Sequence, residues 1–185
     1  AAVKQVAMAD LLVLTKSDLV GAGAVISLCR RLEGVNPTAQ LVNAQDSDVA
    51  STMLQMRYGT VDDMMAGSDI GVADDHDHRH DDDHLDGVSS FSIISERAIS
   101  WADFSALLAR LNMVKGDDLL RVKGLVKIAS QDRPVVIHGV QQMIHSPSML
   151  DQWPGGDART RIVCIVRDHM AECVRQAVEA VIGGS

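Results

Sequence analysis

The fold of this 185-residue chain can be approached from the segment Leu120-Arg121-Val122-Lys123-Gly124-Leu125-Val126-Lys127-Ile128. Apolar residues or glycine occupy every second position from Val122 to Ile128, and basic residues occupy most positions between them. Side chains of a β-strand alternate between its two faces. The segment therefore predicts a half-buried strand, with one face in the core and a basic face in solvent.

Segments on both sides of this strand predict the rest of a domain over residues 88–185. Apolar and β-branched runs indicate further strands at residues 89–95, 134–140, 143–150 and 162–166. Ser100-Trp101-Ala102-Asp103 is typical of a capping box that opens a helix. The expected core face of that helix is Phe104, Leu107, Leu108 and Leu111. A closing helix is expected to bury Ala171, Val174, Ala177, Val178 and Val181. The order β-α-β-β-β-β-α predicts an α+β fold, a mostly antiparallel sheet with helices on one face.

Residues 62–87 form a polar, acidic linker ahead of this domain. Residues 62–86 contain ten aspartates and one arginine, whereas the rest of the chain has 16 basic and 15 acidic residues. The net charge of -8 therefore belongs to the linker. Such a linker repels phosphate, and no basic run exists elsewhere, so we do not expect nucleic acid as a partner.

The linker contains Asp74-Asp75-His76-Asp77-His78-Arg79-His80-Asp81-Asp82-Asp83-His84, which holds four of the seven histidines. Neutral imidazole is a common ligand of zinc, cobalt, nickel and copper, and neighbouring carboxylates add oxygen ligands or compensate charge. We expect this His/Asp tract to bind a divalent metal ion. The expected ligands are His76, His78, His80, His84, Asp77 and Asp81. The alternative is a plain acidic spacer with incidental histidines.

Residues 1–61 predict a parallel α/β unit. The runs 9–15 and 40–44 are expected to be strands buried on both faces. Between them, Val25, Leu28 and Leu32 share one face of a helix that stops at Gly34 and Asn36-Pro37. A further helix is expected around Val49, Met53 and Met56. So few strands do not close a core, and we expect this unit to be part of a larger doubly wound domain.

The first strand is followed by Thr15-Lys16-Ser17-Asp18. Parallel α/β sheets bind ligands at the carboxyl ends of their strands. A carboxylate there accepts two hydrogen bonds from a guanine edge, and the stem of a lysine covers the base. The pattern is that of the Asn-Lys-x-Asp motif of GTPases, with Thr15 in the Asn position. The alternative is a solvated turn.

Several segments in the same order resemble the CobW-like metallochaperone GTPases. Residues 7–19 resemble the strand and guanine loop of that family, and Val35-Asn36-Pro37-Thr38-Ala39 resembles its Asn-Pro-x-Ala element. The His/Asp tract lies where many members carry a histidine-rich metal loop. In the C-terminal half the resembling elements are Arg121-Val122-Lys123-Gly124, Trp153-Pro154 and Arg159-Thr160-Arg161-Ile162-Val163.

This resemblance implies an α/β fragment of a P-loop GTPase sheet at 1–61, the linker at 62–87, and the α+β C-terminal domain of the family at 88–185. It implies the metal-binding and interaction portion of a GTP-dependent chaperone for zinc or cobalt, with a role similar to cobalamin synthesis. Thr15, Lys16 and Asp18 would recognise guanine. GTP and Mg²⁺ would be cofactors of the full-length protein, and the partner would be a client metalloprotein. The alternative is a protein-interaction module without a metal role.

Two motifs of the family are missing: the phosphate loop Gly-x-x-x-x-Gly-Lys-Ser/Thr and the metal motif Cys-x-Cys-Cys. We therefore expect a C-terminal piece of such a protein. It should not hydrolyse GTP alone, because phosphoryl transfer depends on positioned phosphate and Mg²⁺. No nucleophile–base pair predicts a catalytic residue. Whether the chain forms a homo-oligomer is left open.

The remaining reactive side chains are expected to be structural. Cys29, Cys164 and Cys173 form no Cys-x-x-Cys pair and are expected to be buried thiols in a reducing cytoplasm. We expect neither a signal peptide nor a membrane span. His138 and His145 are expected to be structural histidines rather than ligands, and His169 a surface or capping residue. A basic sheet face is also predicted, as solvated charge in preference to a docking surface: Arg121, Lys123, Lys127, Arg159, Arg161 and Arg167.

Overall fold

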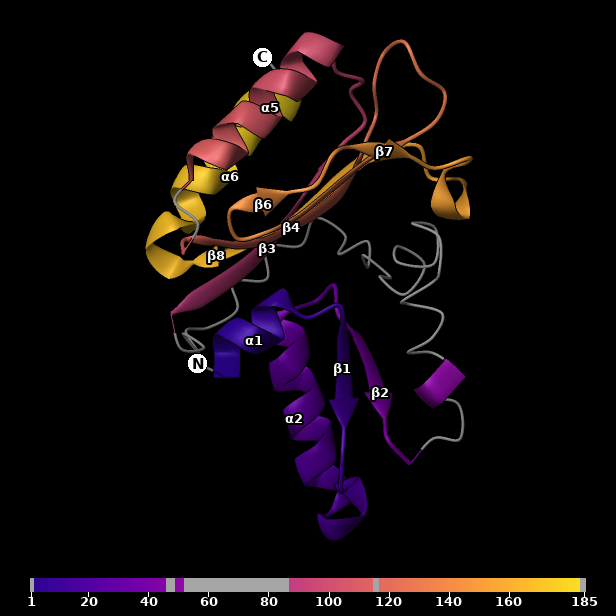
Figure 1. The fold of residues 1–185 in the computed structure, drawn as a ribbon, viewed down its shortest axis with the longest axis vertical. Coiled ribbons are helices and arrows are strands. Elements are labelled where there is room, and N and C mark those ends of the chain that lie inside the picture. The colour runs from indigo at the N-terminus through magenta and orange to yellow at the C-terminus, as the bar shows by residue number, and fades with distance from the viewer. Residues whose placement is uncertain (1, 46–48, 52–86, 115–116, 184–185) are drawn as a thin grey trace. The chain divides into compact units, whose positions relative to one another are not determined.

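The computed structural model describes residues 2–45, 49–51, 87–114 and 117–183 (Figure 1). The chain divides into two compact units, Ala1–Leu85 and Asp86–Ser185. The metal ligands expected in the His/Asp tract lie outside the described residues, as do Met53 and Met56 of the further helix expected in the first unit. Among the described residues, no helix has the length and apolar composition needed to cross a bilayer.

The described part of the first unit has helices packed beside a pair of parallel strands. Its elements are α1 (Ala2–Met8), β1 (Leu11–Leu14), the 3-10 turn η1 (Ser17–Leu19), α2 (Ala22–Val35) and β2 (Gln40–Asn43). β1 pairs with β2 from Leu11 opposite Gln40 to Leu14 opposite Asn43. The expected strand–helix–strand order and the parallel pairing are therefore present.

The expectation that both strands are buried on both faces is wrong for this unit. β2 is only half-buried, and Val13 in β1 is exposed. The reason is that each strand pairs only with the other among the described residues. α2 likewise leaves Ile26 and Leu28 exposed. It ends at Val35, one residue beyond Gly34, where Asn36-Pro37 follows.

The second unit is built on a six-stranded antiparallel sheet. Its elements are β3 (Val88–Ser95), α5 (Trp101–Met113), β4 (Leu119–Val126), β5 (Val135–Val140), β6 (Met143–Ile144), β7 (Ser148–Met149), η2 (Pro154–Gly156), β8 (Thr160–Arg167), η3 (Asp168–Met170) and α6 (Ala171–Ile182). The strands are ordered β3-β8-β4-β5-β6, and β7 also pairs with β5. The predicted α+β fold is confirmed.

One predicted strand of this sheet is divided. Residues 143–150 form β6, which pairs with Gly139 and Val140, and β7, which pairs with Val135 and Val136 at the other end of β5. Pro147 lies between the two short strands. Proline has no backbone N–H to donate to a strand ladder, so a continuous strand is interrupted there.

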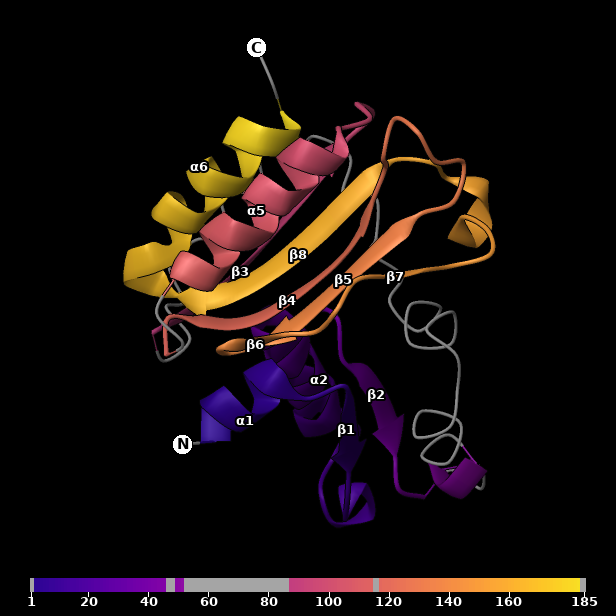
Figure 2. The same ribbon diagram turned by 45° about the horizontal axis from the view of Figure 1, so that its top comes forward.

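Helices α5 and α6 lie together on one face of the sheet (Figure 2). The hydrophobic core lies between these helices and the sheet. It includes Val122, Ile162 and Cys164 from the strands, with Leu107 from α5 and Val178 from α6. The predicted capping box is present: Ser100 Oγ accepts from Asp103 N at 3.1 Å, and Asp103 Oδ2 accepts from Ser100 N at 3.3 Å. The hydrogen bonds from Ser100 also lower the pKa of Asp103.

The prediction that β4 is half-buried is wrong. Every residue of β4 is buried, and Arg121 and Lys123 are 1% and 2% exposed. β4 is a central strand, paired with β5 on one side and with β8 on the other, so neither of its edges is open to solvent. Arg121 and Lys123 each have an interaction partner. They are therefore not the solvated charges that alternation alone predicts.

Candidate functional site

The residues expected to recognise guanine follow β1 directly. Thr15 and Lys16 form the loop after Leu14, and Asp18 lies in η1. All three side chains are exposed. Lys16 has a left-handed backbone, with φ 58° and ψ 29°, which turns the chain sharply away from the strand. Residues in sparsely populated conformations concentrate in functional loops, where the surrounding structure holds them.

The carboxyl ends of β1 and β2 are tied together beside this loop. Ser17 Oγ donates to Asn43 Oδ1 at 2.9 Å, and the same oxygen accepts from Gln45 N at 3.1 Å. Ala44 N donates to Leu14 O at 2.7 Å. Sequence reasoning did not single out Asn43, although it ends a parallel strand at the edge where such sheets bind ligands. Together these bonds fix the backbone that presents Lys16 and Asp18.

The Asn-Pro element of the first unit has a structural role. The side-chain amide of Asn36 donates to three carbonyl oxygens: those of Val6 at 2.8 Å, Ala7 at 3.3 Å and Ala9 at 2.9 Å. Its Oδ1 accepts from Thr38 N and Thr38 Oγ1. The side chain is almost wholly buried, so it connects the end of α2 to the residues that lead into β1.

The metal ligands expected from the sequence are His76, His78, His80, His84, Asp77 and Asp81, none of which the structure describes. Within residues 2–45, 49–51, 87–114 and 117–183, no group of three or more His, Cys, Asp and Glu side chains is placed to hold a metal ion.

Two histidines that were not predicted to be neighbours lie close together in the second unit. His138 lies in β5 and His145 directly follows β6, and their ring centroids are 5.1 Å apart. Both residues are equally distant from the turn at Gln141-Gln142, but only the pairing of β5 with β6 sets the register that brings them together. His169 is an exposed residue, as expected, with Nε2 3.3 Å from Asp118 Oδ1.

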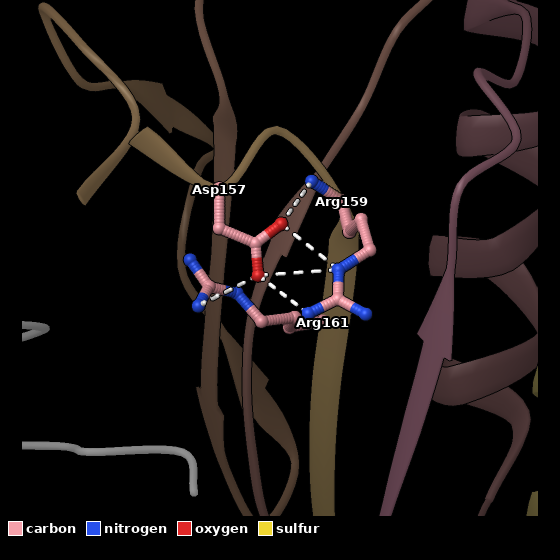
Figure 3. A network of polar contacts seen from close by, with 3 residues as sticks. All are labelled: Asp157, Arg159 and Arg161. Carbon is pink, nitrogen blue, oxygen red and sulfur yellow. Dashed lines mark hydrogen bonds and ion pairs between the residues drawn. The ribbon is translucent and has the colours of Figure 1, made fainter. Parts of the chain in front are cut away.

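Asp157 joins two of the basic residues at the start of β8 (Figure 3). It accepts from Arg159 Nε at 2.9 Å and Nη2 at 2.8 Å, and Arg161 Nη1 lies 3.6 Å away. The hydrogen bond from Arg159 lowers the pKa of Asp157, and the same contact raises the pKa of Arg159. The predicted basic face included Arg159 and Arg161 as solvated charge and did not include the carboxylate of Asp157. The two arginines are therefore partly neutralised where they stand.

The three cysteines differ in exposure, which corrects the expectation that all are buried. Cys164 is buried in the core, Cys29 is half-buried and Cys173 is exposed on α6. Burial raises the pKa of the Cys164 thiol to about 12. Cys173 is exposed because only one face of α6 packs on the sheet, and position 173 lies beside that face.

The chain is similar to the crystal structure of Zn(II)-bound YjiA GTPase from E. coli, with a TM-score of 0.69 and 21% identity over 97% of this chain and 54% of that one. A Zn(II)-bound triple mutant of YjiA GTPase gives a TM-score of 0.66 and 20% identity, with the same coverage. The chain thus spans about half the length of these structures, and the likeness shows the fold.

No curated protein matches the chain. The model of the domain family described as "Cobalamin synthesis protein cobW C-terminal domain" matches residues 88–182, which is the whole of the antiparallel sheet with α5 and α6. That match covers more than half of the sequence. The chain therefore belongs to the CobW C-terminal domain family.

Proposed function

We propose that this chain is the metal-binding and interaction portion of a GTP-dependent metal chaperone that carries zinc or cobalt to a client metalloprotein. The observation that carries the proposal is the position of the His/Asp tract, which directly precedes the family domain at residues 88–182. The Zn(II) named for the YjiA structures adds support, because that fold accommodates zinc in a relative.

In this proposal residues 1–61 form part of a GTPase domain. Lys16 and Asp18 fit recognition of a guanine base, because both are exposed at the carboxyl end of a parallel strand. The exposed apolar residues Val13, Ile26 and Leu28 fit a unit that packs against further elements of an α/β domain. GTP would supply the energy of phosphoryl transfer, with Mg²⁺ bound to its phosphates. The sequence offers no phosphate loop, so this chain alone is not expected to hydrolyse GTP.

The proposed metal ligands are the tract residues His76, His78, His80, His84, Asp77 and Asp81. Imidazole and carboxylate are borderline and hard ligands, which accept several divalent ions. The tract has no fixed ligand spacing, so we expect modest affinity and more than one ion per chain. Binding should weaken as the pH falls through the ordinary imidazole pKa of about 6.5, because a protonated imidazole does not coordinate metal.

Calorimetric titration of zinc and of cobalt into the full chain tests this proposal. Replacing His76, His78, His80 and His84 together by Ser should remove most of the heat of binding. A matched variant replaces Asp74, Asp75, Asp82 and Asp83 by Asn; it keeps every imidazole and should retain most of the heat. If wild type and the histidine variant give equal heats, the tract is only an acidic spacer and the chain is better described as a protein-interaction module.

A further inference from the structure

We propose that His138 and His145 form a separate metal site, a two-imidazole chelate for zinc or a similar borderline divalent ion. The site belongs to the antiparallel sheet of the second unit and does not depend on the His/Asp tract. It revises the expectation that both histidines are only structural.

The strand pairing sets the two side chains directly opposite each other. Gly139 pairs with Ile144, and the backbone N–H of His145 donates to the carbonyl oxygen of His138 at 2.9 Å. Opposed residues of an antiparallel pair have Cβ atoms about 4.5–5.5 Å apart and share one face. Ile144 packs against the core, so its neighbour His145 lies on the face of the sheet away from α5 and α6.

The distance between the rings is the one that a shared metal requires. Zinc–nitrogen bonds are about 2.0–2.1 Å long, so two imidazoles bound to one tetrahedral zinc have ring centres about 5 Å apart. The observed centroid separation is 5.1 Å, with 39° between the ring planes. In the proposed site the rings turn about their side-chain torsions so that one nitrogen of each faces the metal, and the strand register stays as it is.

The surroundings also fit such a site. His138 is half-buried and His145 is exposed, so the pair is anchored on one side and open to solvent on the other. Water or a carboxylate of a binding partner could supply the remaining ligands. Each imidazole has two ring nitrogens, so one can bind the metal while the other keeps a hydrogen bond. Lys123 pairs with His138 from β4, and its positive charge should limit the affinity.

The test uses the full chain with His76, His78, His80 and His84 replaced by Ser, so that the tract contributes no imidazole. Cobalt titration, followed by its visible absorption and by the histidine ring signals in NMR, should give one saturable site that zinc displaces. In that background, either His138→Gln or His145→Gln should weaken binding at least tenfold. The matched control is His169→Gln, an exposed histidine outside the pair, which should leave binding unchanged.

A second measurement guards against loss of folding in the variants. Zinc should raise the unfolding midpoint of the chain whose four tract histidines are replaced by Ser, read from the fluorescence of Trp101 and Trp153. It should not raise the midpoint when His145→Gln is added to that chain. If the chain without tract histidines shows no saturable cobalt binding, the His138–His145 site is overturned, and the proposal for the His/Asp tract is unaffected. Equal loss in the His169→Gln control would also overturn the His138–His145 site.

Discussion

The side-chain amide of Asn36 lies 2.9 Å from the carbonyl oxygen of Ala9 and donates a hydrogen bond to it. The same amide reaches the carbonyls of Val6 and Ala7, so one buried residue after α2 holds the segment that leads into β1. A local sequence signal, Asn-Pro at a helix end, thereby acts as a tertiary contact about thirty residues away in the chain.

Asn36→Ala should destabilise the first unit by about 3 kcal/mol, because buried carbonyls lose their donors. Hydrogen exchange read by mass spectrometry should show faster exchange in residues 2–14. Residues 88–182 of the same molecule serve as the internal control and should exchange as before. Asn36→Asp keeps the acceptor for Thr38 but loses the donor, so it should be at least as damaging. Unchanged exchange in both variants would contradict the role given to Asn36.

Gly124→Ala should destabilise the second unit by about 3 kcal/mol. A Cβ at this position would lie 2.7 Å from the carbonyl oxygen of Arg161 and 3.1 Å from the Cα of Ile162, and neither backbone atom can move without disturbing the pairing of β4 with β8. Urea unfolding followed by tryptophan fluorescence measures the loss, since both tryptophans lie in this unit. Gly139→Ala is the milder comparison, because its nearest contacts are 3.0 Å away, to side chains of Ile144 and Val122.

Asp157 should contribute to stability in a pH-dependent way. The hydrogen bond from Arg159 lowers its pKa in the folded state below the ordinary value of 3.8. A lowered pKa means that the folded state favours the ionised form. The contribution is therefore complete above the ordinary pKa, and it is lost as the pH falls through the lower folded-state pKa.

Asp157→Asn should accordingly reduce stability at neutral pH and flatten the acid limb of the stability curve. The measurement is the urea midpoint between about pH 2 and about pH 6, the range in which carboxylates titrate. Asp151→Asn is the control: Asp151 pairs with Arg133, but its side chain is 89% exposed, where an ion pair contributes little. An acid limb of equal slope in wild type and Asp157→Asn would contradict this prediction.

The cysteines should react with a thiol reagent in a fixed order. Cys173 is exposed and should react first, whereas Cys164 is buried with a pKa of about 12. The thiolate is the reactive form, and at about pH 8 only roughly one in 10⁴ of such thiols is ionised. Labelling counted by mass spectrometry should leave Cys164 unmodified until urea is added. Cys173→Ser should remove the fast phase, and prompt modification of Cys164 in the folded chain would show that the core is open.

The elements of the second unit were predictable because each depends on a local pattern. The Ser100–Asp103 capping box, the strand β4 and the apolar face of α6 are each predicted by a short local pattern, and all three appear in the structure. The same holds at the first unit, where an apolar run followed by Thr15-Lys16-Ser17-Asp18 becomes β1 and an exposed loop.

Most of the predictions that the structure corrected concern burial and side-chain partners, which depend on how the elements are arranged. Arg121 and Lys123 are buried because β4 is central, and the order of strands in a sheet is a property of the whole domain. Asn43 meets Ser17 only once β1 has paired with β2. Asp157 meets Arg159 and Arg161 nearby in the chain, where η2 leads into β8, and no regular helix or strand pattern predicts that contact. The unequal burial of Cys164 and Cys173 depends on which surface each faces.

By itself, then, the sequence determined the type and order of most helices and strands, the concentration of negative charge in one tract, and the residues that end β1. Periodicity, capping and charge are properties of neighbouring residues, which is why they could be read directly. Only the tertiary structure decided strand order, the burial of the basic residues and the meeting of His138 with His145. Those depend on strand register and on contacts between residues that are far apart in the chain, and no local pattern specifies them.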